Sequence, residues 1–80
     1  MTRVPRFYFD AVLQGRTETD REGVELADRA VARQEAIRAA AEMAKDQHLD
    51  GDARDITVAI REGDKPIATI RLSLKIEESA

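Results

Sequence analysis

Apolar and polar residues alternate over two parts of the chain, and a segment of helical periodicity lies between them. In residues 6–13 every second side chain is apolar, as in a strand with one buried face; these are Phe7, Phe9, Ala11 and Leu13. Gly15 then supplies a turn, because glycine adopts positive φ without steric cost. A weaker pattern predicts a second, edge strand somewhere between residues 17 and 26.

The last third of the chain gives the clearest strand pattern. Ile56, Val58 and Ile60 alternate with small or polar residues. After a connection that contains a glycine and a proline, apolar residues recur at every second position from Ala68 to Ile76. These two stretches predict a β-hairpin.

The middle of the chain, from Arg29 to about Gln47, contains neither Gly nor Pro and is rich in strong helix formers. Asp28 precedes it and can accept hydrogen bonds from the free amides of the first helical turn. At 100° per residue the apolar side chains gather on one face of this helix and the charged ones on the other. The predicted apolar face comprises Ala32, Ala36, Ile37, Ala40, Met43 and Ala44.

The order β-β-α-β-β predicts an α+β fold, in which an antiparallel sheet carries one amphipathic helix packed on one face. A chain of 80 residues can bury about 60% of its unfolded surface, which suits one modest core. We therefore expect a single domain over residues 1–80, with an ordered core at about 5–76. The absence of Cys excludes disulfides, thiolate metal sites and Cys nucleophiles.

Charged residues are numerous but evenly spread, with 13 Lys plus Arg against 16 Asp plus Glu and a net charge of -3. Nucleic-acid binders usually concentrate Lys and Arg into one field, so this distribution argues against a nucleic-acid partner. No apolar run approaches the roughly 18 residues of a membrane helix, and none near the start resembles a secretory signal. We expect a cytoplasmic protein with no membrane partner.

Candidate catalytic and metal-binding residues are few. His48 is the only imidazole and has Asp46 near it in the sequence, but a cation at the end of a helix explains it better than a catalytic base. The aspartates between residues 50 and 55 lack the longer alternation of oxygen donors that a calcium loop requires. Gly23 lies in an acidic stretch without the glycine density of a phosphate loop, so a tight turn accounts for it. We expect no enzyme, no cofactor and no bound metal.

The sheet face that the helix leaves uncovered is the best candidate surface for recognition. Its candidate interaction residues are Arg6, Tyr8, Arg61, Arg71 and Lys75, and Ile67 is expected to share this face. Tyr8 is suited to be an amphipathic anchor, with the arginines as pairing groups at the rim. The sequence therefore favours a small non-enzymatic module that binds a protein partner, or itself as a homodimer, through this face or an edge strand. The alternative is a nucleic-acid-binding module that stacks bases on Tyr8.

Several short segments, in order along the chain, are similar to one family. They are Pro-Arg-Phe-Tyr-Phe-Asp at 5–10, Asp-Arg-Glu-Gly-Val-Glu-Leu at 20–26, Ala-Arg-Gln-Glu-Ala-Ile at 32–37 and the hairpin segments 54–58 and 70–74. Over about residues 5–76 the chain resembles a family of small uncharacterised proteins of rhizobia and other alphaproteobacteria, catalogued as a domain of unknown function. The resemblance implies an α+β fold and a bacterial cytoplasmic protein, and it brings no known activity, cofactor or catalytic residue.

The chain departs from that family's pattern around its helix. Ala27 and Arg29 stand where Pro and Leu are common, and Ala40 stands where Leu is common, which thins the apolar face. The order of elements is also similar to that of HicB-like antitoxin domains, in which a sheet-and-helix module binds a toxin. This second likeness is one of fold alone, and it implies antitoxin-type partner binding as a further alternative.

Overall fold

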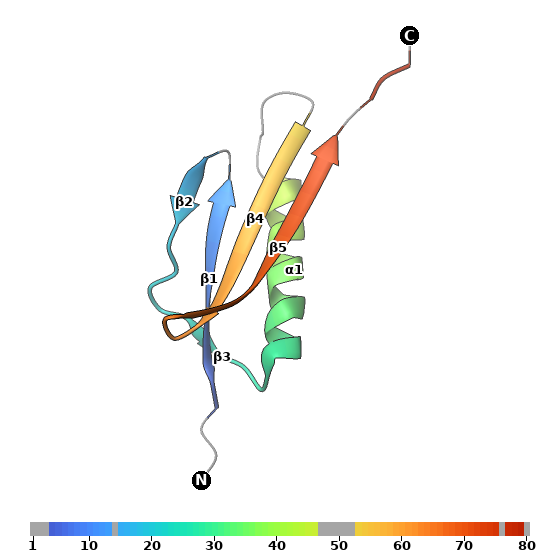
Figure 1. Ribbon diagram of the computed structural model, residues 1–80. Coiled ribbons are helices and arrows are strands. Elements are labelled where there is room, and N and C mark those ends of the chain that lie inside the picture. Colours follow the sequence, from blue (N-terminus) through green and yellow to red (C-terminus); the bar gives the residue numbers. More distant parts are fainter. Residues whose placement is uncertain (1–3, 14, 47–52, 76, 80) are drawn as a thin grey trace.

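A computed structural model of the chain describes residues 4–13, 15–46, 53–75 and 77–79. It shows an antiparallel sheet with one helix against one of its faces (Figure 1). The elements are β1 (Arg6–Leu13), β2 (Arg16–Glu18), β3 (Val24–Glu25), α1 (Arg29–Asp46), β4 (Ala53–Glu62) and β5 (Lys65–Lys75). The predicted α+β fold with paired strands on either side of one helix is confirmed.

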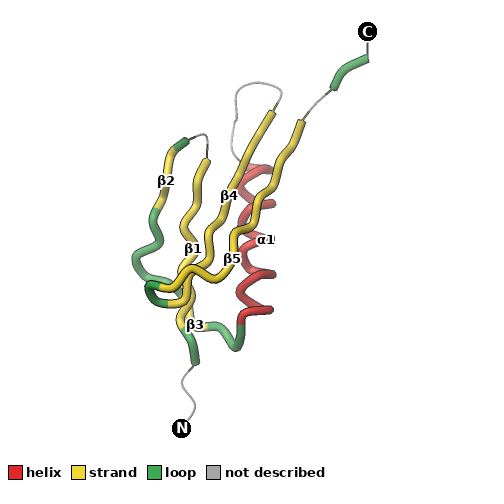
Figure 2. Tube along the Cα trace, viewed as in Figure 1, coloured by secondary structure: helices red, strands yellow, loops and turns green. Residues whose placement is uncertain are grey.

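The order of strands in the sheet is β2-β1-β4-β5, with β3 also paired to β1 (Figure 2). Phe7 pairs with β4 on one side and with Val24 of β3 on the other, and Leu13 likewise pairs with β4 and with Arg16 of β2. Both short strands therefore lie on the side of β1 that faces away from β4. The long strands β4 and β5 form the predicted hairpin. Within the described residues β5 pairs only with β4, so its other edge is open.

The edge strand expected between residues 17 and 26 is in fact two short strands. Asp20 interrupts it, because its carboxylate accepts hydrogen bonds from the N–H groups of Glu22 and Gly23 at 3.1 and 3.0 Å. These bonds fold the backbone into a turn, and the ladder with β1 stops at Glu18 and resumes at Val24. Short-range alternation could not show this break, since the interruption comes from one side chain.

The helix begins where the sequence predicts, directly after Asp28. The Asp28 carboxylate accepts a hydrogen bond from the N–H of Val31 at 3.0 Å, which satisfies an amide of the first turn. Arg38 on the outer face contacts Glu35 at 2.6 Å and Glu42 at 3.1 Å, spacings that add modest support to a helix. The segment 47–52, with His48 and the turn expected there, lies outside the described residues.

The core lies between α1 and the helix side of β1 and β4. Its buried residues are Phe7, Ala32, Ala36, Ala40, Ile56, Val58 and Ile60. Leu13 and Met43 pack against them, as the two periodicities predict. Ile37 is an exception: it is 55% exposed, because it lies 100° around the helix from Ala36 and so falls at the border of the covered face.

A β-bulge changes the start of β5. Ile60 pairs with Ala68 but its neighbour Arg61 pairs with Pro66, which leaves Ile67 without an opposite residue. The extra residue shifts the alternation of side chains between the two faces. Ile67 was expected on the uncovered face, and instead it packs against the buried core.

We expect an Ala36→Leu substitution to destabilise the fold, since Ala36 is fully buried between helix and sheet. The added methylenes should lower the free energy of unfolding by about 1–3 kcal/mol, as overpacking of a core does. Ala41→Leu, on the exposed side of the same helix, is the matched control and should be nearly neutral. Urea denaturation of both variants measures the difference, and equal stabilities would contradict the close approach of helix and sheet.

Candidate interaction surface

The uncovered face of the sheet brings Tyr8 and Arg61 together. The two residues are opposite each other on β1 and β4, and the guanidinium carbon of Arg61 lies 4.3 Å from the centre of the Tyr8 ring. Arg61 Nε also donates to the Asp10 carboxylate at 2.9 Å, in a pair whose two side chains are largely shielded from solvent. We call the group formed by Tyr8, Asp10, Asp20 and Arg61 the arginine cluster.

The remaining donors of Arg61 bind main-chain carbonyls. One terminal nitrogen donates to the carbonyl of Asp20 at 2.8 Å, and the other to that of Gly63 at 3.0 Å. The guanidinium therefore contacts the loop between β2 and β3 and the turn of its own hairpin. Because its donors are engaged and one face of the Tyr8 ring is covered, this pair serves the fold itself.

Asp20 closes the outer edge of β1 between the two short strands. Its carboxylate accepts a hydrogen bond from the N–H of Phe9 at 3.1 Å, and its own N–H donates to Asp10 at 2.8 Å. The Asp20 side chain thus accepts a hydrogen bond from a main-chain N–H of β1, that of Phe9, which pairs with neither β2 nor β3. Asp20, in the acidic segment 20–26, thereby closes part of an otherwise exposed sheet edge.

The electrostatics of the arginine cluster favour ionised carboxylates. The hydrogen bond from Arg61 lowers the pKa of Asp10 below its ordinary value, against the opposing effect of burial. Burial alone would raise the pKa of Asp20, but hydrogen bonds from three backbone N–H groups outweigh it and lower the pKa overall. The contact with Asp10 raises the pKa of Arg61 in turn.

Gly23 packs directly against the ring of Tyr8. Its φ is +69°, and a Cβ at this position would lie 2.7 Å from Tyr8 Cε2 and 2.9 Å from the Phe7 carbonyl oxygen. The sequence pattern suggested that a tight turn alone accounts for Gly23, and this contact shows that it does not. The residue is also required because the loop lies in contact with the sheet.

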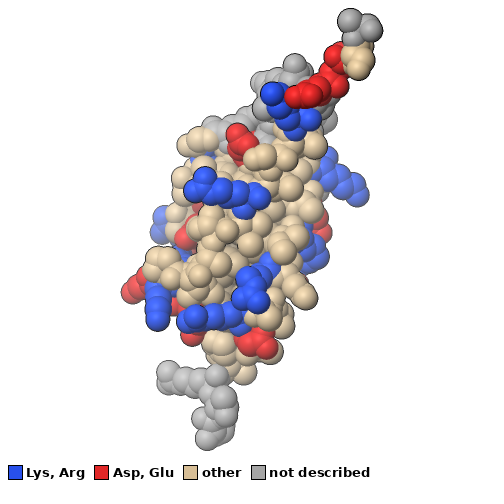
Figure 3. Space-filling view, turned by 45° about the vertical axis from the view of Figure 1, so that its right-hand side comes forward, with Lys and Arg blue, Asp and Glu red and all other residues tan. Residues whose placement is uncertain are grey.

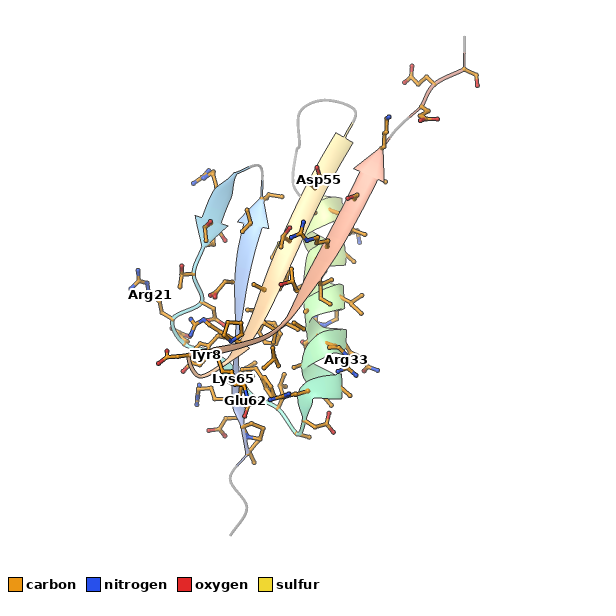
Figure 4. The ribbon with its side chains drawn as sticks, in the orientation of Figure 1. Tyr8, Arg21, Arg33, Asp55, Glu62 and Lys65 are labelled. Carbon is orange, nitrogen blue, oxygen red and sulfur yellow. The ribbon has the colours of Figure 1, made fainter. Side chains whose placement is uncertain are left out.

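Arg6 lies beside the arginine cluster and is paired as well. It donates to the carbonyl of Glu22 at 2.7 Å and to the Glu25 carboxylate at 3.3 Å. Next to it is an open hollow of about 670 Å³, whose walls are Val4, Pro5, Arg6, Tyr8, Glu25, Glu62 and Gly63. Figure 4 shows Tyr8, Glu62 and Lys65 near one another at this end of the sheet. The hollow is shallow and its charges are mixed, which gives no preference for one ligand.

The other two candidate residues, Arg71 and Lys75, lie on β5 and not beside Tyr8. Arg71 is exposed and faces Thr57 of β4, and Lys75 lies 3.7 Å from Glu77. The five predicted interaction residues therefore fall into two groups, one around Tyr8 and one along β5. The sequence pattern could not separate them, since the division depends on the order of the strands.

Two leucines on β5 are surface residues, which the sequence pattern did not indicate. Leu72 and Leu74 were expected on the covered face, and they remain 36% and 43% exposed. Both lie on β5, which among the described residues pairs only with β4, so their outer side is left uncovered at the edge of the sheet (Figure 1). Figure 3 shows a largely uncharged surface on this side of the molecule, with Lys and Arg side chains around it. We call Ile70, Arg71, Leu72, Ser73 and Leu74 the β5 strip.

The described residues contain no group of three His, Cys, Asp or Glu side chains that could hold a metal ion. His48 and its neighbours lie outside them. None of the described segments forms a helix long and apolar enough to span a membrane.

A family model whose description is domain of unknown function (DUF6894) matches residues 6–73. The chain belongs to the DUF6894 family. The match includes the whole arginine cluster and the β5 strip up to Ser73, and it leaves Lys75 outside. No curated protein and no solved structure shows a significant match to the chain. The resemblance to a domain of unknown function is thereby confirmed, and the alphaproteobacterial origin remains a prediction.

We expect Gly23→Ala to lower the free energy of unfolding by about 2 kcal/mol or more, because it adds a clash with Tyr8 to the cost of positive φ. Gly15→Ala is the matched control, since Gly15 also has positive φ (+78°) but has open space around its Cβ position. Thermal or urea denaturation compares the two variants. Equal losses of stability would show that the loop does not pack on Tyr8.

The lowered pKa values of Asp10 and Asp20 predict a loss of stability in acid. A carboxyl whose pKa is lower in the folded state stabilises the fold above its unfolded pKa of about 3.9 and loses this effect as the pH falls through the folded pKa. The free energy of unfolding should therefore fall below about pH 5. Asp10→Asn should be less stable at pH 7 and show a flatter acid limb, whereas Asp64→Asn in the exposed hairpin turn should leave the wild-type profile intact.

Proposed function

We propose that this DUF6894 domain is a non-enzymatic protein-interaction module whose contact surface is the open edge of β5. The observation that carries the proposal is the contrast between the two edges of the sheet. The edge at β1 is closed by two short strands and by the carboxylate of Asp20. The edge at β5 runs from Lys65 to Lys75 and has, among the described residues, no strand beside it.

An open edge strand presents a row of main-chain N–H and C=O groups to another polypeptide. Such edges are commonly protected by charges, proline or a bulge, because they otherwise add further strands. In β5 these protecting features lie at the two ends of the strand. Pro66 and the bulge at Ile67 are at its start, and Lys75 is at its end. The β5 strip between them carries one charge, on Arg71. This stretch is therefore suited to strand addition.

The side chains of the β5 strip fit the same role. Leu72 and Leu74 project toward the helix side and are partly exposed, so an added strand would bury them against its own apolar positions. Arg71 projects to the opposite face, where it can pair with a polar side chain. Alternation of this kind fixes the register of the added strand.

The contacts of Tyr8 make the sheet edge a better candidate than the open face. Arg61 covers the Tyr8 ring and is itself paired with Asp10, while Arg6 is paired with Glu25. Fewer basic groups are then left for phosphates, and Tyr8 offers less surface for a stacked base. These contacts favour protein binding over the nucleic-acid alternative.

Sedimentation velocity from micromolar to millimolar concentration tests the proposal, because every copy of the domain carries one open edge. We expect reversible association, and we expect Leu72→Lys to raise the dissociation constant roughly tenfold or more by removing a contact worth on the order of 1.4 kcal/mol. Val24→Lys, at a residue 41% exposed on β3 at the other side of the sheet, is the matched control and should change little. A domain that stays monomeric, or equal effects of the two variants, would contradict an interaction through β5.

A further inference from the structure

We infer that the strand bound at this edge is β5 of a second copy, paired antiparallel about a two-fold axis at Leu72. The inference rests on the proposed function and names the partner and the register. A two-fold dimer joins the same patch of both copies, so each register is defined by the one residue that faces its own copy. Only a few registers are possible along β5, and the side chains distinguish them.

Repulsion excludes two of these registers. With the axis at Arg71, two guanidinium groups lie directly opposite each other. With the axis at Ser73, Arg71 of one copy faces Lys75 of the other, twice per dimer. Like charges in directly opposed cross-strand positions destabilise a sheet.

The residues at the start of β5 exclude two further registers. With the axis at Ile70, pairing along the whole of β5 sets Lys65 opposite Lys75 and includes Pro66, and even the seven residues 67–73 include the bulge at Ile67. An axis at Thr69 brings both Pro66 and Ile67 into the paired stretch. Proline cannot donate a ladder hydrogen bond, and the bulge interrupts the alternation.

The axis at Leu72 avoids every one of these conflicts. On the helix side Leu72 then faces Leu72, and Ile70 faces Leu74 twice, which gives a continuous apolar row. On the open face Arg71 faces Ser73 and Thr69 faces Lys75 of the second copy. The paired stretch is residues 69–75, which ends before Pro66 and spans roughly 24 Å at about 3.4 Å per residue.

Charge complementarity supports the same register. Ser73 lies beside Asp55 of β4 and donates a hydrogen bond to its carboxylate at 2.8 Å. Figure 4 shows Asp55 toward the upper end of β4. With the axis at Leu72, Arg71 of the second copy lies next to Ser73 in the same cross-strand row, two strand spacings from Asp55. A long arginine side chain can extend along that row toward the carboxylate, and the two-fold axis provides this arrangement twice.

The size of the contact predicts a reversible dimer. Leu72 and Leu74 are only partly exposed in each copy, so one pair of edge strands should bury less than the roughly 1,200 Å² of a standard stable interface. Association should therefore depend on concentration, and chemical cross-linking is the appropriate way to capture its register.

Single cysteines provide the test, because the chain contains no other Cys. Leu72→Cys places two thiols opposite each other at the axis, and dibromobimane, which bridges only nearby thiols, should link two chains and become fluorescent. Leu74→Cys is the matched control on the same face of the same strand. In this register its thiol is roughly 14 Å from its copy, so it should not link to itself. A mixture of Leu74→Cys with Ile70→Cys should link the two chains.

Sedimentation of the same Leu72→Cys protein separates failure of the register from failure of the proposed function. If it associates but does not link, while Ile70→Cys links to itself, the register is wrong and the interaction edge stands. If it remains monomeric like the wild-type chain, the proposed function is wrong as well. Circular dichroism verifies that each variant is folded.

A pair of charge variants tests the register without cross-linking. Thr69 lies opposite the neutral Ala59 within its own chain and faces Lys75 of the second copy. Thr69→Glu should raise the association constant roughly threefold to tenfold, because two cross-strand ion pairs form at once, and Thr69→Lys should lower it. Changes of the same sign in both variants would overturn the assignment.

Discussion

The contacts of Arg61 are the constraint on which the uncovered side of the sheet depends. One guanidinium contacts the Tyr8 ring, the Asp10 carboxylate and the carbonyls of Asp20 and Gly63. These partners belong to β1, to the loop between β2 and β3 and to the hairpin turn. None of these segments can shift alone without leaving a partly buried charge or carbonyl unpaired, which costs more than the contact itself contributes. A single side chain thereby aligns β4 with β1 and holds the loop against the sheet.

The two faces of the sheet are stabilised by different physical means. On the helix side, small alanines allow close packing against a few large aliphatic residues and Phe7. On the other side, charged side chains and main-chain groups form a connected network. Because the apolar core is small, the polar network has a larger share in keeping the strands in register than it would in a bigger domain. The uncovered face is polar for structural reasons, in addition to any role in binding.

Local pattern predicted the elements well, and distant pairing explains what it missed. The alternation in residues 6–13, the alanine-rich helix after Asp28 and the closing hairpin are each visible within one window of sequence. Tyr8 and Arg61 could be placed on one face in the same way. The contacts of Arg61 with Tyr8 and Asp10 could not be predicted in this way, because Arg61 and Asp10 are 51 residues apart and meet only through the strand order. The exposure of Leu72 likewise depends on the place of β5 at the edge of the sheet, which the strand order sets and alternation does not encode.

The closed side of the sheet determines how far an assembly of this domain can grow. If two copies join through β5 as proposed, the outer edges of the combined sheet would be β2 and β3, which are three and two residues long. Between them the carboxylate of Asp20 already occupies the N–H of Phe9. Strands this short offer little ladder to a third chain, so growth would end at two copies and would not continue into a fibre. In such a dimer the long β5 edge would be covered, which would prevent the open-ended polymerisation to which long edge strands are prone.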